Sequence, residues 1–425
     1  MTVELAAKAA VAIVSEQTLP PAPAADLILT MAASTQSLRS LVFAAYRRAL
    51  NGGSLHFAET EAHSLTHNGI NYQIRYAPNL LKKPISITQP PNPSHSTPPN
   101  PTSKSNPFLP PNPALYITSI PRNHYLVLNK FPVIPGHFIL ATNDFQQQSH
   151  PLAIDDMEAI LSVLKTWDSY HQDNETPSID LTSEAQQHQA LYGFFNSGRE
   201  SGASQPHRHV QFIPLTSEEL DSLWATQLFA SPTENENNNS SNANGVATGK
   251  VGDIEIRYQS RITFKHYFTA IPQDLTPERL WELYSLLLSL AEYTLTHPIT
   301  PSAEVIAAVN ERWDKISATQ RSMDEDVKFS YNLAFTKNWI GVLPRTSETV
   351  HVVDKEEDSG VEMGGVRIKC PGLNLNGTVM AGMMLIRTRK EMDVVLEDPG
   401  CIARTMGGIG VHQQSSNTTA QKSSL

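Results

Sequence analysis

From residue 37 onward, apolar positions follow two spacings that predict a mixture of helices and strands. Apolar residues three and four apart predict helices over residues 37–50, 154–170 and 277–295. Short apolar runs, several of them strictly alternating, predict a larger number of strands. Many strands with few helices predict an α+β fold in which helices flank a large antiparallel sheet. The predicted strands cover residues 55–60, 70–76, 115–120, 124–128, 137–141, 191–195, 254–258, 263–268, 332–335, 340–343 and 379–388.

Two stretches contain too few apolar residues to bury a core. Residues 85–113 are mostly Pro, Ser, Asn and Thr, and residues 231–249 are rich in Asn. We interpret the first as a linker or disordered loop, for which an inert spacer is favoured over a ligand of a proline-binding partner. We interpret the second as a disordered insertion. The predicted organisation is an N-terminal extension (1–34), a first domain (35–230), the insertion (231–249), a second domain (250–408) and a flexible polar tail (409–425).

Composition narrows the class of protein. The 425 residues carry a net charge of −10, which disfavours a general nucleic-acid binder because such a protein needs a basic face. The two cysteines lack a metal-ligand spacing and suit a reducing compartment. No apolar run approaches the roughly 20 residues of a membrane span, and the polar start lacks a secretory signal. We expect a cytoplasmic protein, with the nucleus as a second location, and no membrane partner.

The most unusual stretch covers residues 196–215 and joins small residues to alternating polar side chains. His207, His209 and Gln211 are two positions apart, and the apolar residues after them are typical of a strand. Side chains two apart share one face of a strand, so two imidazoles and an amide would line the same surface. A face this polar suits the wall of a site. The preceding small residues could bring backbone N–H groups close to an anion.

Two histidines two positions apart have three interpretations. They could be structural residues of a polar groove, ligands of a metal ion, or a nucleophile with its orienting partner. Zinc would need further ligands at a recognisable spacing, and none stands nearby. A neutral imidazole attacks phosphorus well when its second nitrogen donates to a fixed acceptor, such as the carbonyl two residues earlier. Because the loop offers anion donors and Gln211 offers a neutral amide, the context favours nucleotidyl transfer.

The stretch from Ser201 to Gln211 resembles the His-x-His-x-Gln signature of the galactose-1-phosphate uridylyltransferase branch of the histidine-triad superfamily. The longer sequence resembles the fungal diadenosine tetraphosphate (Ap4A) phosphorylases, also called ATP adenylyltransferases. The resemblance covers residues 36–390 with two insertions. Its supporting motifs are Arg75 to Pro84, Asn106-Pro107-Phe108, Leu128-Asn129-Lys130 to His137, and Tyr331-Asn332-Leu333 with Trp339 and Pro344-Arg345.

This resemblance implies a reaction and separate roles for the residues of the motif. The family cleaves Ap4A with inorganic phosphate to ATP and ADP, in two steps through a nucleotidyl-histidine. His209 would be the nucleophile, His207 would orient it through its backbone carbonyl, and Gln211 would hold the transferred phosphoryl oxygens. The implied fold is two fused histidine-triad-like halves with one working site. Residues expected to bind substrate are Lys83, Asn129, Lys130, Asn196, Ser197, Gly198, Ser201, Gly202, Ser204, Gln205 and Lys337.

Other residues keep a structural interpretation beside a functional one. His137 could line the site or be structural, and Lys83 could reach phosphate or lie on the surface. Arg345 and Lys337 could contact substrate late in the chain. Arg208 should point to the opposite strand face from its neighbours, where a structural role is favoured. Structural roles are also favoured for Trp339 and His266.

The chain departs from related branches in two informative places. It lacks the Cys-x-x-Cys of the uridylyltransferases, which argues against a hexose-phosphate substrate. Gln211 replaces the third histidine of the small hydrolases, which favours transfer over hydrolysis. We expect a monomer that uses Ap4A, ATP, ADP and inorganic phosphate, without a tightly bound cofactor, and with Mg²⁺ carried by the polyphosphate.

Two alternatives remain beside this reading. One is a nucleotidyltransferase or dinucleoside polyphosphate hydrolase with another nucleotide preference. The other is a catalytically silent nucleotide-binding protein, against which the intact histidines argue.

Overall fold

A single antiparallel sheet runs through most of the structure. The computed structural model describes residues 37–78, 106–168, 183–230, 245–313, 328–350 and 373–413. Within them, ten strands pair in the order β3-β4-β5-β7-β6-β11-β12-β10-β9-β8. The predicted α+β class with a large antiparallel sheet is confirmed. The strands are β3 (Tyr116–Ile120), β4 (His124–Leu128), β5 (Phe138–Thr142), β6 (Ala190–Ser197), β7 (His209–Leu215), β8 (Val246–Val251), β9 (Ile254–Gln259), β10 (Tyr267–Ala270), β11 (Ser330–Phe335) and β12 (Trp339–Arg345).

The sheet consists of two halves with the same strand order. Numbered within each half, β3-β4-β5-β7-β6 and β8-β9-β10-β12-β11 both read 1-2-3-5-4. The halves meet where β6 pairs with β11, and this pairing is symmetric: Phe195 opposes Leu333, and Gly193 opposes Phe335. The predicted boundary at residues 231–249 therefore separates two halves of one continuous sheet, and the described residues form one compact unit.

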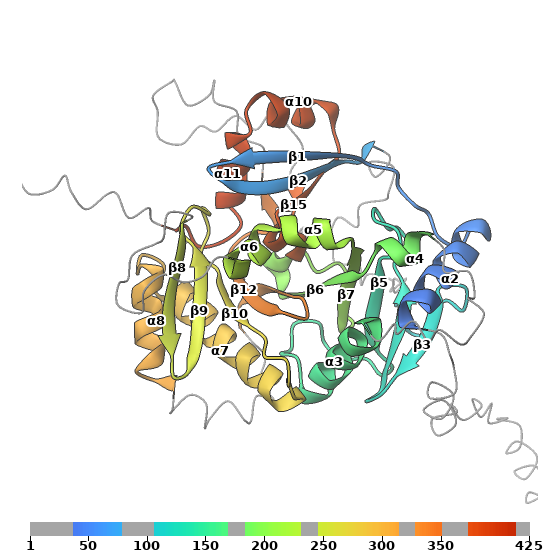
Figure 1. The fold of residues 1–425 in the computed structure, drawn as a ribbon, viewed down its shortest axis with the longest axis horizontal. Helices are drawn as coiled ribbons and strands as arrows, with labels where there is room; N and C mark the ends of the chain where they lie inside the picture. The colour runs from blue at the N-terminus through green and yellow to red at the C-terminus, as the bar shows by residue number, and fades with distance from the viewer. Residues whose placement is uncertain are drawn as a thin grey trace, which may run out of the picture. The chain divides into compact units, whose positions relative to one another are not determined.

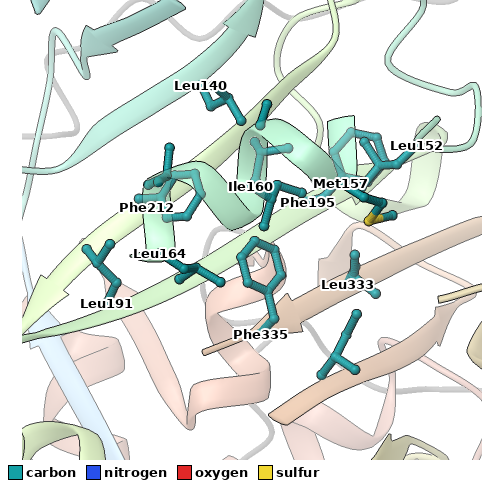
Figure 2. Close-up of a cluster of buried hydrophobic side chains, with 14 of the residues drawn as sticks. Leu140, Leu152, Met157, Ile160, Leu164, Leu191, Phe195, Phe212, Leu333 and Phe335 are labelled. Carbon is teal, nitrogen blue, oxygen red and sulfur yellow. The ribbon is translucent and has the colours of Figure 1, made fainter. Parts of the chain in front are cut away.

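One face of the sheet is covered by helices from both halves. Helices α3 and α7 pack against each other over this face (Figure 1). Figure 2 shows Met157, Ile160 and Leu164 of α3 meeting Phe195 and Phe335 from the central strands. Thr276 caps α7 by accepting from the Arg279 N–H, and Pro277 occupies its first position. The helices near this face are α2 (Leu38–Asn51), α3 (Ile154–Asp168), α4 (Ser183–Gln187), α7 (Pro277–Thr296) and α8 (Ser302–Asn310).

The opposite face carries shorter elements and a second core. Trp224, Phe268 and Trp339 pack there with residues of a three-stranded sheet, β1-β2-β15, which lies at the top of Figure 1. None of the helices in the described residues is long and apolar enough to cross a bilayer. The remaining elements are β1 (Glu61–His67), β2 (Ile70–Tyr76), η2 (Arg199–Ser201), α5 (Ser217–Ser222), α6 (Trp224–Ala230), β13 (Thr349–Val350), β14 (Leu373–Asn374), η5 (Gly377–Ala381), β15 (Met383–Ile386), α10 (Arg389–Glu397) and α11 (Gly400–Gly407).

Several predicted strand boundaries were wrong. The structure shows that contacts of the buried backbone, and not only the local spacing of apolar residues, decide where a strand begins and ends. The predicted strand 55–60 is irregular, although Leu55 is buried and the N–H groups of His56 and Ala58 donate to carbonyls of residues 130 and 132. The predicted strand 263–268 begins only at Tyr267. The strand predicted over 379–388 is split between η5 and β15. Helices α8, α10 and α11 were not predicted.

Three segments predicted to be flexible contain ordered residues. Phe108, inside the predicted linker 85–113, is buried, and its carbonyl accepts from Tyr125 Oη at 2.8 Å. The end of the predicted insertion forms β8 from Val246. In the predicted tail, Ile409 is fully buried, and the carbonyl of Val411 accepts from the Lys265 N–H. Each segment is ordered by partners outside it: Tyr125 for Phe108, strand β9 for β8, and Lys265 for Val411.

Candidate active site

His209 is held as a neutral imidazole at the start of β7. Its Nδ1 donates to the backbone carbonyl of His207 at 2.8 Å, which leaves the Nε2 lone pair for a reacting atom. Its own N–H donates to Gln148 Oε1 at 2.7 Å, so backbone and ring are both fixed. Burial lowers the pKa of His209 to about 4, with a smaller lowering from the neighbouring His207 and an opposing effect of the bond to the His207 carbonyl. The ring is therefore neutral near neutral pH and has a free Nε2, the form in which a histidine can act as a nucleophile.

His207 lies two positions earlier and is fixed from both ring nitrogens. Nε2 donates to the Thr142 carbonyl at 2.8 Å, and Nδ1 accepts from Asn106 Nδ2 at 2.9 Å. Burial lowers the pKa of His207. With its ring held in this way, His207 presents its carbonyl to His209 in a constant direction, as an orienting residue requires.

Aromatic rings surround the two imidazoles. The Phe108 ring centroid lies 5.2 Å from that of His209 and 5.4 Å from that of His207. Phe145 meets His207 edge-on at 5.6 Å and is 46% exposed. The buried Phe108 ring shields the His209 imidazole from water, which accounts for part of the depressed pKa of His209.

Gln211 is oriented by two side chains from the segment that joins β4 to β5. His137 Nε2 donates to Gln211 Oε1 at 3.1 Å, and Asn129 Nδ2 donates to His137 Nδ1 at 3.3 Å. Burial lowers the pKa of His137 to about 4, so the ring is neutral and one nitrogen can accept. Because the Gln211 oxygen is engaged by His137, the amide nitrogen is the group that Gln211 can turn towards an anion. His137, for which the sequence left two roles open, lies within the site.

The small-residue loop between β6 and β7 turns through two glycines in the left-handed region. Gly198 has φ +83° and Gly202 has φ +81°, values that L side chains rarely adopt. Ser201 Oγ donates to the Gly198 carbonyl at 2.6 Å and closes the turn. Ser197 Oγ donates to the Ser149 carbonyl. Further along the loop, Ser204 is exposed and Gln205 is half-buried.

Asn196, the last residue but one of β6, is almost completely buried. Its Oδ1 accepts from Asn332 Nδ2 and from the Gly377 N–H, both at 2.9 Å. Its Nδ2 has no hydrogen-bond partner among the described residues. Gln148 Nε2 donates to the carbonyls of Asn196 and His209, at 2.8 and 3.2 Å, and so ties the two strand ends together.

Of the three lysines expected to bind phosphate, the structure describes Lys130 and Lys337. Lys130 is exposed, with Nζ 5.6 Å from the centroid of the Phe131 ring. Lys337 is exposed in the turn between β11 and β12, at the opposite end of β11 from Asn332, which pairs with Asn196. Lys83 lies outside the described residues. The structure therefore gathers the loop and the histidine strand, but does not bring Lys337 to them.

Several residues that complete the site were not identified from the sequence. Gln148 follows two other glutamines, and nothing local marks it as the one that contacts His209. Asn106 and Phe108 were noted as part of a motif without a role, and they lie in a stretch whose composition indicates a linker. Asn332 was noted only within a motif, and Arg345 was expected at most to contact substrate; the pairing of β6 with β11 brings both to the loop from the second half.

Arg208 points away from the site, as the strand alternation predicted. Its Nη1 contacts Asp156 Oδ2 on α3 at 2.9 Å, and His124 Nε2 contacts the other oxygen of the same carboxylate at 2.9 Å. All three side chains are buried. This charged cluster anchors the back of the histidine strand to α3.

The second half lacks the chemical groups of the first. In the first half Ala141 pairs with His209, and at the matching position of the second half Ala270 pairs with Trp339. Two positions further along the strand, Gly341 stands where the first half has its glutamine. The structural interpretation of Trp339 is confirmed, because it is 1% exposed. At these two matching positions, the second half therefore has neither the histidine nor the glutamine of the first.

Comparisons with known families give matches along most of the chain. Residues 29–189 and 180–230 match the Ap4A phosphorylase N-terminal domain, and residues 260–412 match the ATP adenylyltransferase C-terminal domain. Diadenosine 5',5'''-P1,P4-tetraphosphate phosphorylase 2 of Saccharomyces cerevisiae (strain ATCC 204508 / S288c) is 24% identical over 398 residues, which are 91% of this chain and 97% of that protein. Protein APA1 of the same yeast is 24% identical over 379 residues, 86% of this chain and 91% of that protein.

Solved structures show the same fold. Yeast Ap4A phosphorylase Apa2 in complex with Ap4A has a TM-score of 0.57 at 20% sequence identity, covering 89% of this chain and 98% of that one. The same enzyme in complex with AMP has a TM-score of 0.54 at 19% identity, with coverage of 89% and 98%.

The two family models follow one another along the chain and reach both halves of the ten-stranded sheet, so the similarity is not confined to the histidine motif. The protein is a nucleotidyltransferase of mixed α+β fold. It belongs to the Ap4A phosphorylase family. Among the described residues, no group of three or more His, Cys, Asp or Glu side chains is arranged to hold a metal ion.

Proposed function

We propose that this protein cleaves Ap4A with inorganic phosphate, giving ATP and ADP, through a nucleotidyl group carried on His209. The observation that carries the proposal is the bond from His209 Nδ1 to the His207 carbonyl, which leaves Nε2 free of a proton beside the small-residue loop. The matched family and the yeast relative, both named for Ap4A phosphorylase, support the choice of Ap4A.

In the first step, the Nε2 lone pair of His209 attacks the phosphorus of one adenylyl group. A nitrogen–phosphorus bond forms as the bond from that phosphorus to the bridging oxygen breaks, and ATP leaves. The imidazole becomes cationic, and its Nδ1–H keeps its bond to the His207 carbonyl. This carbonyl therefore stabilises positive charge that is absent before the step, which lowers the barrier.

In the second step, an oxygen of inorganic phosphate attacks the same phosphorus. The nitrogen–phosphorus bond breaks, ADP leaves, and the neutral ring is restored. Gln211 and the loop of residues 196–205 contribute donors to the transferred phosphoryl oxygens, whose charge is highest between bond breaking and bond making. Mg²⁺ bound to the polyphosphate would neutralise the remaining charge, and we place no protein ligand on it. We propose that the enzyme acts as a monomer in the cytoplasm, with the nucleus as a second location.

Of the three lysines expected to bind phosphate, we keep two in this proposal. Lys83 and Lys130 remain candidates for the polyphosphate, together with Asn129. Lys337 does not, because the turn that carries it lies at the far end of β11.

The test uses the full chain with Ap4A, in the presence and absence of inorganic phosphate, with products separated by ion exchange. Phosphate-dependent formation of equal ATP and ADP supports the proposal, whereas cleavage to AMP and ATP that ignores phosphate contradicts it. Without phosphate, the protein should retain one adenylyl group in an acid-labile, alkali-stable linkage.

Substitution of the nucleophile gives a matched comparison within the same chain. His209→Asn should abolish both turnover and the retained adenylyl group. His266 is also buried, and its Nδ1 also donates to the carbonyl two residues earlier, at 2.8 Å, but it lies in the second half. His266→Asn should therefore leave labelling of the folded fraction intact. Labelling that survives in His209→Asn identifies another nucleophile.

A further inference from the structure

Arg345, at the end of β12, uses all its nitrogen atoms in contacts inside the protein. Nε donates to the Ile409 carbonyl at 3.2 Å, and Nη2 donates to the carbonyls of Ser347 and Leu375 at 2.7 and 2.9 Å. Nη1 donates to Asn332 Oδ1. The side chain is 2% exposed, so it has little surface left for a substrate. A guanidinium has no acceptor, and Asn332 must therefore present its oxygen to Arg345.

The orientation of Asn332 in turn determines that of Asn196. With its oxygen turned to Arg345, Asn332 presents Nδ2, which donates to Asn196 Oδ1 and to the Ser201 carbonyl at 2.9 and 2.8 Å. The Gly377 N–H donates to the same Asn196 oxygen. If the Asn196 amide were reversed, its NH₂ group would face two other donors, Asn332 Nδ2 and the Gly377 N–H. Asn196 Oδ1 is thus committed to the protein, and Nδ2 takes the remaining direction.

That remaining nitrogen is a buried donor without a partner among the described residues. Asn196 is 2% exposed, and buried amide groups are normally hydrogen-bonded. It opens the loop that turns at Gly198 and Gly202, and Gln148 links its carbonyl to that of His209. A donor left unpaired beside a nucleophile and an anion-binding loop is suited to a phosphoryl oxygen.

We propose that Arg345 and Asn332 are positioning residues that orient the Asn196 amide, so that its Nδ2 donates to the transferred phosphoryl group. The inference rests on the proposed function, because the acceptor is the phosphorus centre that His209 attacks. It assigns Arg345 a role through two asparagines rather than by contact with substrate. Through these two residues, the second half of the sheet would orient a side chain that binds substrate in the first half.

Asn332→Asp tests this arrangement with little change of shape. The new carboxylate still accepts from Arg345, but it cannot donate to Asn196. The Asn196 amide should then rotate to donate to Asp at this position, and its oxygen would face the phosphate. We expect kcat for adenylyl transfer to fall by about 100-fold, the usual effect of losing one preorganised donor, with a much smaller change in KM.

A double-mutant cycle with Asn196→Ala separates this mechanism from charge repulsion. If Asn332 acts through Asn196, adding Asn332→Asp to Asn196→Ala should cause no further loss of kcat. If the carboxylate repels the substrate directly, the two losses should multiply, and the inference is overturned.

Controls address folding and the proposed function. Arg39 is also a buried arginine that donates to backbone carbonyls, those of Trp167 and Ala185, away from the loop. Arg39→Lys should lower Tm without changing kcat of the folded fraction. Arg345→Lys should lower kcat, and it replaces Asn332→Asp as the test variant if Asn332→Asp does not fold. If the Asn332→Asp enzyme keeps a kcat within about threefold of the wild type, this inference is overturned, but the proposed function is not. A wild type inactive on Ap4A would instead overturn the proposed function.

Discussion

The pH dependence of adenylyl transfer to His209 gives a direct measure of how the site prepares its nucleophile. Attack requires the neutral ring, and burial lowers the pKa of His209 to about 4. A folded-state pKa below the ordinary value means that the neutral form persists as pH falls, until the folded pKa is approached. The first step should therefore continue unchanged into mildly acidic solution.

The size of the effect follows from the shift. A histidine with the ordinary pKa of about 6.5 would be only about 10% neutral at pH 5.5. With a pKa of about 4, His209 would remain more than about 90% neutral at the same pH. We expect kcat/KM for the first step to change by less than about twofold between pH 7.5 and 5.5, against about tenfold for an unperturbed ring.

The assay is a single turnover of Ap4A without inorganic phosphate, followed by quench and measurement of the retained adenylyl group. Leaving phosphate out removes its own titration, and Ap4A has no terminal phosphate to ionise in this range. Phe108→Ala provides the comparison, since loss of the ring 5.2 Å from His209 admits water and should move the fall in rate to higher pH. A wild-type rate that halves near pH 6.5 would refute the reasoning.

Three further substitutions test other parts of the structure. Asp156→Asn leaves buried Arg208 without its counter-charge and should lower the free energy of unfolding by about 3–5 kcal/mol, measured by urea denaturation; a loss below about 1 kcal/mol would contradict this account. Gly341→Ala places a Cβ 2.2 Å from the Phe268 ring and should cost about 1–3 kcal/mol in the same measurement, with adenylyl transfer by the folded protein retained. Lys337→Ala should leave kcat/KM for Ap4A within about twofold of the wild type, and a larger fall would place this lysine at the substrate after all.

The spacing of apolar and polar residues correctly predicted features that depend on residues close together in the chain, such as the start of a helix and the two faces of a strand. Helix α7 begins at the predicted residue because Thr276 and Pro277 supply a cap and a favourable first turn. The alternation in β7 correctly placed His209 and Arg208 on opposite faces, since side chains alternate in any strand.

Contacts between distant segments could not be predicted in the same way. Gln148 reaches His209 across 61 positions, and Asn332 reaches Asn196 across 136. Nothing in the local sequence distinguishes these amides from surface amides. The proline-rich composition around Phe108 predicts a linker, although this ring is buried and packs against His209. Such positions depend on contacts between distant segments, within the first half for Gln148 and Phe108 and between the halves for Asn332, and local composition does not indicate them.

The joining of two like halves in one chain has a consequence for how the site is assembled. Asn332 and the Gly377 N–H reach Asn196 from the second half. If the halves were separate subunits, these contacts would form only on association and would be lost on dilution. Because a single backbone carries both, the encounter is intramolecular, and its effective concentration does not depend on the amount of protein. The phosphate loop should therefore be complete in every folded chain, however scarce the enzyme is.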